Sequence, residues 1–217
     1  LEGGGGGALY INDMAVVTST NDRYSNNQAI QGYGGAVYAR SAGNMSSTNN
    51  FYISNNATNG NGGAIYVSSM AAFMSTSDNI KNNTVAASGG NGGGLYVEEK
   101  GTVRMDSTIF KYHNVSEYGG SIYLSSGANV TILNNEISES AAVSGAGIYL
   151  TGVDTYLALS GSSILSNTAN SSGGGVYVSD KAVLQARDNL YSNNTAHANL
   201  TSDGGGGALY INDVGVV

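Results

Sequence analysis

The chain has 217 residues and carries 8 Lys plus Arg against 15 Asp plus Glu, which gives a formal net charge of −7. So few basic residues exclude the electrostatic surface of a nucleic-acid-binding protein. The absence of Cys excludes disulfide frameworks, thiol catalysis and cysteine zinc sites. Against this background, 33 Gly, 26 Asn and 28 Ser together with 41% hydrophobic residues predict an all-β protein rich in tight turns.

The first predicted element is a short strand that reads small–small–small–aliphatic–Tyr, closed by another apolar residue. It occurs eight times, first at residues 6–11, with successive tyrosines 26 to 33 residues apart. Such regular recurrence indicates a structural repeat. The tyrosines of the motif are Tyr10, Tyr38, Tyr66, Tyr96, Tyr123, Tyr149, Tyr177 and Tyr210.

Two further strands are predicted in each repeat after a short polar turn. The second strand centres on an apolar residue, namely Val17, Met45, Phe73, Val103, Val130, Leu157 or Leu184. The third carries an aliphatic or aromatic residue two positions before an Asn, and only Ile137-Ser138-Glu139 breaks this pattern. The predicted asparagine column is Asn26, Asn55, Asn82, Asn114, Asn167 and Asn193.

Three short strands in about 28 residues predict one coil of a parallel β-helix, or β-solenoid. Helical repeats are disfavoured because each Gly inside a helix costs about 1 kcal/mol, and because the apolar residues alternate with period two. Residues 1–217 are therefore predicted to form a single continuous solenoid of about seven coils.

The paired motifs resemble the repeats of the polymorphic outer-membrane proteins, which are chlamydial autotransporters. The first half of the signature matches at Gly62-Gly63-Ala64-Ile65. The aromatic-x-x-Asn half is matched by Tyr24-Ser25-Asn26-Asn27, Ile53-Ser54-Asn55-Asn56, Ile80-Lys81-Asn82-Asn83 and Tyr191-Ser192-Asn193-Asn194. Tyr, Ile or Leu replaces Phe, and Val115, Ser140 and Thr168 replace the last Asn in three coils. The resemblance implies a right-handed β-helix and an exposed adhesive or structural shaft.

Stacked coils turn each repeat position into a column with a spacing of about 4.8 Å. Because Tyr alternates with aliphatic residues, the eight tyrosines are predicted to point outward. The small residue two positions before each Tyr is predicted to face outward as well, so that a shallow groove flanks the rings. The tyrosine column either stabilises the strands or forms a contact surface for glycan or a neighbouring filament. The asparagine column is predicted to be structural, through left-handed turns and stacked amides.

Eight N-x-Ser/Thr sequons mark possible glycosylation sites. They begin at Asn44, Asn56, Asn82, Asn114, Asn129, Asn170, Asn193 and Asn199.

The ionisable residues predict no catalytic site, no metal site and no cofactor. Asp13, Glu99, Asp180 and Asp213 follow the Tyr motif as turn residues, and Asp22, Asp78 and Asp188 precede the third strand. Pectin-cleaving enzymes on this fold need such groups clustered on one face. His113 and His197 fall in different coils and are predicted to be solvated.

The two ends of the sequence resemble each other more closely than any two interior coils do. Residues 4–17 and 204–217 are identical at 12 of 14 positions, at an offset of 200 residues. This offset predicts a seven-coil super-repeat within a longer array. Insertions collect between the third strand and the next Tyr motif, and residues 196–205 are predicted to protrude.

Taken together, these patterns predict a non-enzymatic structural protein at the cell surface or outside the cell, as the shaft of a filament, appendage or adhesin. The predicted partners are neighbouring copies of the protein, in end-to-end or lateral contact, and glycans or host-surface molecules. No nucleic acid and no membrane insertion of this segment are expected. The alternative is a polysaccharide-binding or polysaccharide-cleaving β-helix.

Overall fold

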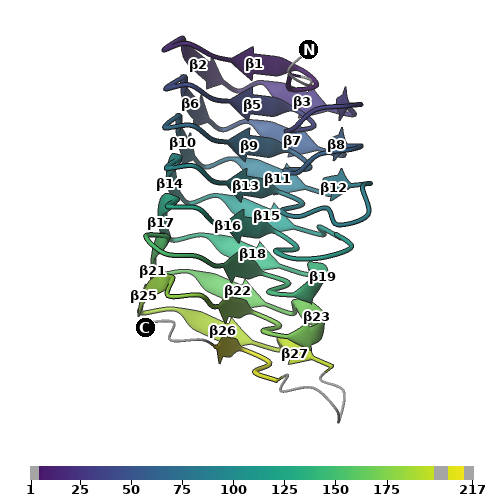
Figure 1. The fold of residues 1–217 in the computed structure, drawn as a ribbon, viewed down its shortest axis with the longest axis vertical. Helices are drawn as coiled ribbons and strands as arrows, with labels where there is room; N and C mark the ends of the chain where they lie inside the picture. Colours follow the sequence, from purple (N-terminus) through teal and green to yellow (C-terminus); the bar gives the residue numbers. More distant parts are fainter. Residues whose placement is uncertain (1–4, 198–204, 213–217) are drawn as a thin grey trace.

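The computed structural model describes residues 5–197 and 205–212. They form a stack of coils that runs from the purple N-terminal coil to the yellow C-terminal one (Figure 1). Each coil contributes one strand to each of three sheets, and every strand pairs in parallel with the equivalent strands of the neighbouring coils. This arrangement confirms the predicted parallel β-solenoid.

Sheet A holds the Tyr motif of every coil. Its strands are β1 (Leu9–Ile11), β5 (Val37–Ala39), β9 (Ile65–Val67), β13 (Leu95–Val97), β16 (Ile122–Leu124), β20 (Ile148–Leu150), β24 (Val176–Val178) and β28 (Leu209–Ile211).

Sheet B holds the second, five-residue strand of each coil. Its strands are β2 (Val16–Thr20), β6 (Asn44–Thr48), β10 (Ala72–Thr76), β14 (Thr102–Asp106), β17 (Asn129–Leu133), β21 (Tyr156–Ser160) and β25 (Val183–Arg187). Sheet C holds the third strands, which are β3 (Arg23–Ser25), β7 (Phe51–Ile53), β11 (Asn79–Lys81), β15 (Ile109–Lys111), β18 (Glu136–Ser138), β22 (Ser163–Leu165) and β26 (Leu190–Ser192).

A fourth strand, which the sequence pattern did not predict, follows sheet C in six coils. The fourth strands form two three-stranded sheets, β4 (Gln28–Ala29), β8 (Asn56–Ala57) and β12 (Thr84–Val85), and β19 (Ala141–Ser144), β23 (Thr168–Ser172) and β27 (Thr195–Ala196). Isolated bridges from Asn114 to Thr84 and to Ala141 link the two groups. Four of these six strands have only two residues, which is too short to show an alternating pattern in the sequence.

The core is a continuous apolar filling between sheets A, B and C. The strands of sheet A from β1 to β24 place their first and third residues in this core, as Ile65 and Val67 do in β9. The largest fully buried side chains are Tyr52, Phe73 and Phe110. Equivalent residues pair directly across coils, for example Tyr66 with Tyr96. The tyrosines of sheet A therefore stack on one another from β1 to β28.

Residues with positive φ make the corners of each coil. A glycine that precedes sheet A has such a φ in each coil from the second on, for example Gly62 at 70°. Asn26, Asn82 and Asn193 take the same conformation at the end of sheet C, at 54° to 58°. A short polar side chain tolerates this region better than other side chains do.

The small residue two positions before each Tyr faces the interior, which corrects the prediction of an outward groove. A Cβ atom on Gly94 would lie 2.7 Å from the Phe110 ring, and Ala36 and Ala64 belong to the core cluster. The chain bends between this residue and the aliphatic one, so simple alternation back from Tyr fails. The residue at this corner must be small because its backbone lies in direct contact with the core side chains. Most of the predicted protruding loop at residues 196–205 lies outside the described residues.

Candidate functional site

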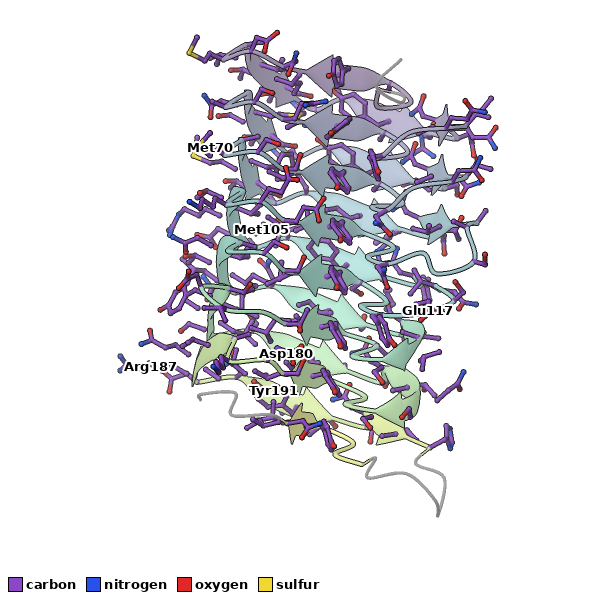
Figure 2. All side chains as sticks on the ribbon, viewed as in Figure 1. Met70, Met105, Glu117, Asp180, Arg187 and Tyr191 are labelled. Atoms are coloured by element: carbon purple, nitrogen blue, oxygen red, sulfur yellow. The ribbon has the colours of Figure 1, made fainter. Side chains whose placement is uncertain are left out.

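The eight motif tyrosines form one column of rings on the outer side of sheet A. Their chain neighbours belong to the core, while Tyr38, Tyr66 and Tyr96 form a separate cluster. Adjacent ring centroids lie 4.6 to 5.4 Å apart from Tyr10 to Tyr210. Figure 2 shows that side chains at equivalent positions line up along the stack, with Met70 and Arg187 projecting at its edge.

Exposure varies strongly along this column. Tyr10 is 48% exposed and the rings from Tyr123 to Tyr210 are half-buried, but Tyr38, Tyr66 and Tyr96 are only 3% to 6% exposed. Tyr33, from the preceding loop, covers two of these rings, with centroids 5.6 Å from Tyr38 and 4.5 Å from Tyr66. The prediction of a uniformly exposed strip is therefore wrong for the buried rings, and a role in binding stays a prediction for the others.

Ring stacking predicts a measurable loss of stability when one tyrosine is removed. Tyr123 stacks on Tyr96 at 4.7 Å and on Tyr149 at 5.3 Å, with interplanar angles of 9° and 3°. Because each aromatic pair contributes about 0.5–1.5 kcal/mol beyond burial, Tyr123→Leu should lower the free energy of unfolding by about 1–3 kcal/mol. Tyr156→Leu is the control, since Tyr156 makes no ring contact in the described part of the chain. Chemical denaturation measures both, and equal losses would contradict the stacking contribution.

Tyrosine hydroxyls of the column face the polar residue that follows sheet A, either in their own coil or in the next one. Ser68, Ser125 and Ser179 are hydrogen-bond partners of Tyr38, Tyr123 and Tyr149, respectively. Burial raises the pKa of each of these three phenols. The phenols therefore stay protonated at neutral pH and act as hydrogen-bond donors.

At one coil this polar residue is a carboxylate. Glu98 accepts hydrogen bonds from the hydroxyls of both Tyr66 and Tyr96, the second at 3.2 Å. Burial, followed by Glu98, raises the pKa of Tyr66. The same two influences raise the pKa of Tyr96. Glu98 was not among the residues predicted from the sequence, although no other described residue of its column carries a carboxylate.

A buried polar ladder runs along the corner after sheet C. In each coil the side chain of one residue accepts the backbone N–H of the equivalent residue in the preceding coil, at 2.8 to 3.2 Å. The ladder residues are Asn27, Asn55, Asn83, His113, Ser140, Asn167 and Asn194. This accounts for backbone groups that would otherwise be buried without a partner.

The predicted asparagine column differs from this ladder in register. Asn55 and Asn167 belong to the ladder, but Asn26, Asn82 and Asn193 lie one residue before it, at the left-handed turn. The remaining member, Asn114, lies one residue after the ladder and is exposed. The ladder residue always lies three positions after the inward-facing residue of sheet C. The predicted column counted from Ile53, Tyr112 and Leu165, which lie two residues before Asn55, Asn114 and Asn167. The residues that face the core in these strands are instead Tyr52, Phe110 and Ile164.

His113 is a ladder member and is 1% exposed, which corrects the prediction that it is solvated. Its Nδ1 accepts the Asn83 N–H at 3.1 Å, and its Nε2 donates to the Ile80 carbonyl oxygen at 3.0 Å. Burial lowers the pKa of His113 to about 4, so the ring is neutral at pH 7. His197 is exposed.

A second polar ladder runs along the corner between sheets B and C. It includes Asp22, Asn50, Asp78, Thr108, Asn135, Ser162 and Asn189, with N–H···O distances of 2.7 to 3.1 Å.

Asp78 is fully buried and accepts from the Ser75 hydroxyl at 2.7 Å. Burial raises the pKa of Asp78. Its position corrects the view of Asp78 as a simple surface turn residue, whereas Asp13, Glu99, Asp180 and Asp188 do occupy positive-φ turns. Asp213 lies outside the described residues.

The sequon asparagines lie mostly on the surface. Asn44, Asn82, Asn114, Asn129, Asn170 and Asn193 are exposed and Asn56 is half-buried. Asn199 lies outside the described residues. Glycosylation at these positions stays a prediction.

Across residues 5–197 and 205–212, no group of three or more His, Asp or Glu residues is arranged to hold a metal ion. No helix in the same ranges is long and apolar enough to cross a membrane. The repeated chemistry of the molecule lies in its columns of Tyr and of polar ladder residues.

Two family models match the chain. The model described as the right-handed β-helix region matches residues 69–217, and the Chlamydia polymorphic membrane protein repeat matches residues 50–68. The second segment holds Tyr52 and Asn55 of one coil, followed by Gly62-Gly63-Ala64-Ile65-Tyr66. These matches confirm the resemblance inferred from the motifs. Neither a curated protein nor a solved structure is significantly similar to the chain.

Proposed function

The chain belongs to the right-handed β-helix family, and from this we propose that it is a rigid, non-enzymatic shaft of an extracellular or cell-surface protein. The observation that carries the proposal is the unbroken repetition of one coil design. The sheet pairings, the tyrosine column and both polar ladders all bond coil to coil along the axis. Such one-dimensional bonding resists bending and needs no disulfides.

The match of residues 50–68 to the Chlamydia polymorphic membrane protein repeat supports a location at the cell surface. A shaft of an autotransporter-type adhesin or of a surface filament agrees with this match. The alternative functions on this fold are polysaccharide binding and cleavage. The half-exposed rings from Tyr123 to Tyr210 favour binding over cleavage, although neighbouring rings cover much of each other's faces.

We also propose that further coils continue the stack, supplied by the same chain or by a second copy. β28 pairs with β24 in the same register in which β1 pairs with β5, and both strands read Leu-Tyr-Ile. Seven coils at about 4.8 Å give an axial repeat of about 34 Å. Electron micrographs of the native material test this continuous stack. Their power spectra should show an axial repeat of about 34 Å.

The shaft function is tested on intact producing cells and on purified protein. Antibody labelling and added protease should reach the protein on intact cells, and small-angle scattering should give the profile of a rod. Incubation with acidic polysaccharides should release no new reducing ends. Release of reducing ends, or protection of the protein inside intact cells, would contradict the proposal.

A further inference from the structure

The tyrosine column places one carboxylate against a continuous run of stacked phenols. Tyr66 and Tyr96 are parallel within 2° with centroids 4.9 Å apart, and Tyr123 continues the stack at 4.7 Å. Both hydroxyls of the first pair donate to Glu98. The neighbouring phenols of Tyr38 and Tyr123 bond to the hydroxyls of Ser68 and Ser125, and the Ser125 hydroxyl is also a partner of Tyr96. A Ser hydroxyl is a poor proton acceptor, whereas a carboxylate is a good one.

This geometry has the parts that one-electron oxidation of a phenol requires. A phenol that loses an electron becomes a strong acid, so oxidation at neutral pH needs a base within hydrogen-bond reach. Glu98 is half-buried, and Tyr66 and Tyr96 are 3% and 6% exposed. The rings are thereby shielded from radical coupling with other molecules. The exposed end of the column, Tyr10, lies 5.4 Å from Tyr38 and is open to an external oxidant.

We propose that Tyr66, Tyr96 and Glu98 form a redox-active site that holds a tyrosyl radical. A one-electron oxidant in solution removes one electron from an exposed ring of the column. The electron deficiency then passes between stacked rings to Tyr66 or Tyr96. The O–H bond of that phenol breaks, its proton forms a new O–H bond with the Glu98 carboxylate, and the product is a neutral tyrosyl radical beside a carboxylic acid. The oxidant is reduced by one electron, so charge and atoms balance.

The test uses photogenerated tris(bipyridine)ruthenium(III) as the oxidant, with persulfate as the final electron acceptor. Freeze-quenched electron paramagnetic resonance of the whole protein should show a neutral tyrosyl radical, and its formation should slow in D₂O because a proton moves with the electron. The double variant Tyr66→Phe plus Tyr96→Phe should lose the long-lived part of the signal. Tyr156→Phe, which alters a tyrosine outside the column, should keep it.

The base is tested with a matched pair of neighbouring glutamates. Glu98→Gln should slow formation of the long-lived radical by about 10²-fold, the lower end of the contribution of a positioned base. Glu99→Gln makes the same charge change, but Glu99 accepts from Ser69 and contacts no tyrosine hydroxyl. It should behave like the unaltered protein. Circular dichroism verifies that each variant is folded.

Two results would overturn the proposal. One is the absence of a long-lived tyrosyl signal in the unaltered protein, which needs no variant to fold. The other is equal radical kinetics in folded Glu98→Gln and Glu99→Gln.

Discussion

Asn55→Ala is expected to lower the free energy of unfolding by about 2–6 kcal/mol. Asn55 is fully buried in the ladder after sheet C. Its Oδ1 accepts the backbone N–H of Asn27 at 3.0 Å, and its Nδ2 donates to the Tyr24 carbonyl oxygen at 3.0 Å. Alanine leaves both backbone groups without these partners, and each unsatisfied buried group costs about 1–3 kcal/mol. The loss is a large fraction of the 5–15 kcal/mol that stabilises a typical protein.

Asn56→Ala is the matched control, because it deletes the same side chain at the next position. The Asn56 side chain is half-buried and accepts one long hydrogen bond, from Thr84 Oγ1 at 3.4 Å. Its loss should change the stability by less than about 0.5 kcal/mol. Chemical denaturation monitored by circular dichroism compares the two variants. Similar midpoints for both would refute the energetic role of the ladder.

The second large effect is a loss of stability on acidification, caused by His113. Its pKa is about 4 in the folded protein and 6.5 in a model peptide, because burial disfavours the charged ring. Between these values the unfolded chain binds a proton that the folded chain does not, so stability falls as the pH decreases from about 6.5 to 4. A shift of this size corresponds to about 3 kcal/mol. Protonation of His113 would also put a hydrogen on Nδ1, which then faces the backbone N–H of Asn83. Two donors would face each other, and this hydrogen bond of the ladder would be lost.

Asp78 acts in the opposite direction within part of this range. Burial raises the pKa of Asp78 above its usual 3.8, so the folded state binds a proton more readily than the unfolded state and acid offsets some of the loss. His113→Asn isolates the histidine contribution, because Asn already accepts and donates the equivalent bonds at position 55. The stability of the variant should depend less on pH between 4 and 6.5. An unchanged pH dependence would exclude His113 as the cause.

The motifs predicted the fold well because a solenoid repeats its constraints. Each coil from the second on has a glycine at a left-handed corner. All eight occurrences of the motif also have apolar residues on either side of an outward Tyr, so the same order occurs eight times. Local alternation within a strand decides which side chains face the core. That argument holds for Leu95, Tyr96 and Val97, which lie within a single strand. It fails for Gly94, because the chain turns between residue 94 and the strand.

The position of the buried asparagines could not be found by counting residues from a sequence motif. Where two asparagines are adjacent, as at Asn82-Asn83, local sequence does not say which one takes the left-handed turn and which one points inward. The frame is set by the inward residue of sheet C, which is Ile80 in that coil and Tyr52 in the preceding one. Burial of these side chains depends on packing against other coils, so only the structure identifies them.

The sequence by itself determined the coil length, the strand order and the column of tyrosines, since these follow from local alternation and from the constant repeat. Only the tertiary structure decided which polar residues are buried and which rings are covered. His113 occupies a position that Asn fills in other coils, and only the stacking of coils removes it from water. Tyr33 covers Tyr38 and Tyr66 from a loop without a repeated pattern. The burial of His113 depends on contacts between residues about 28 or more positions apart, and the covering of Tyr38 and Tyr66 depends on the path of a loop. Neither produces a periodic pattern in the sequence.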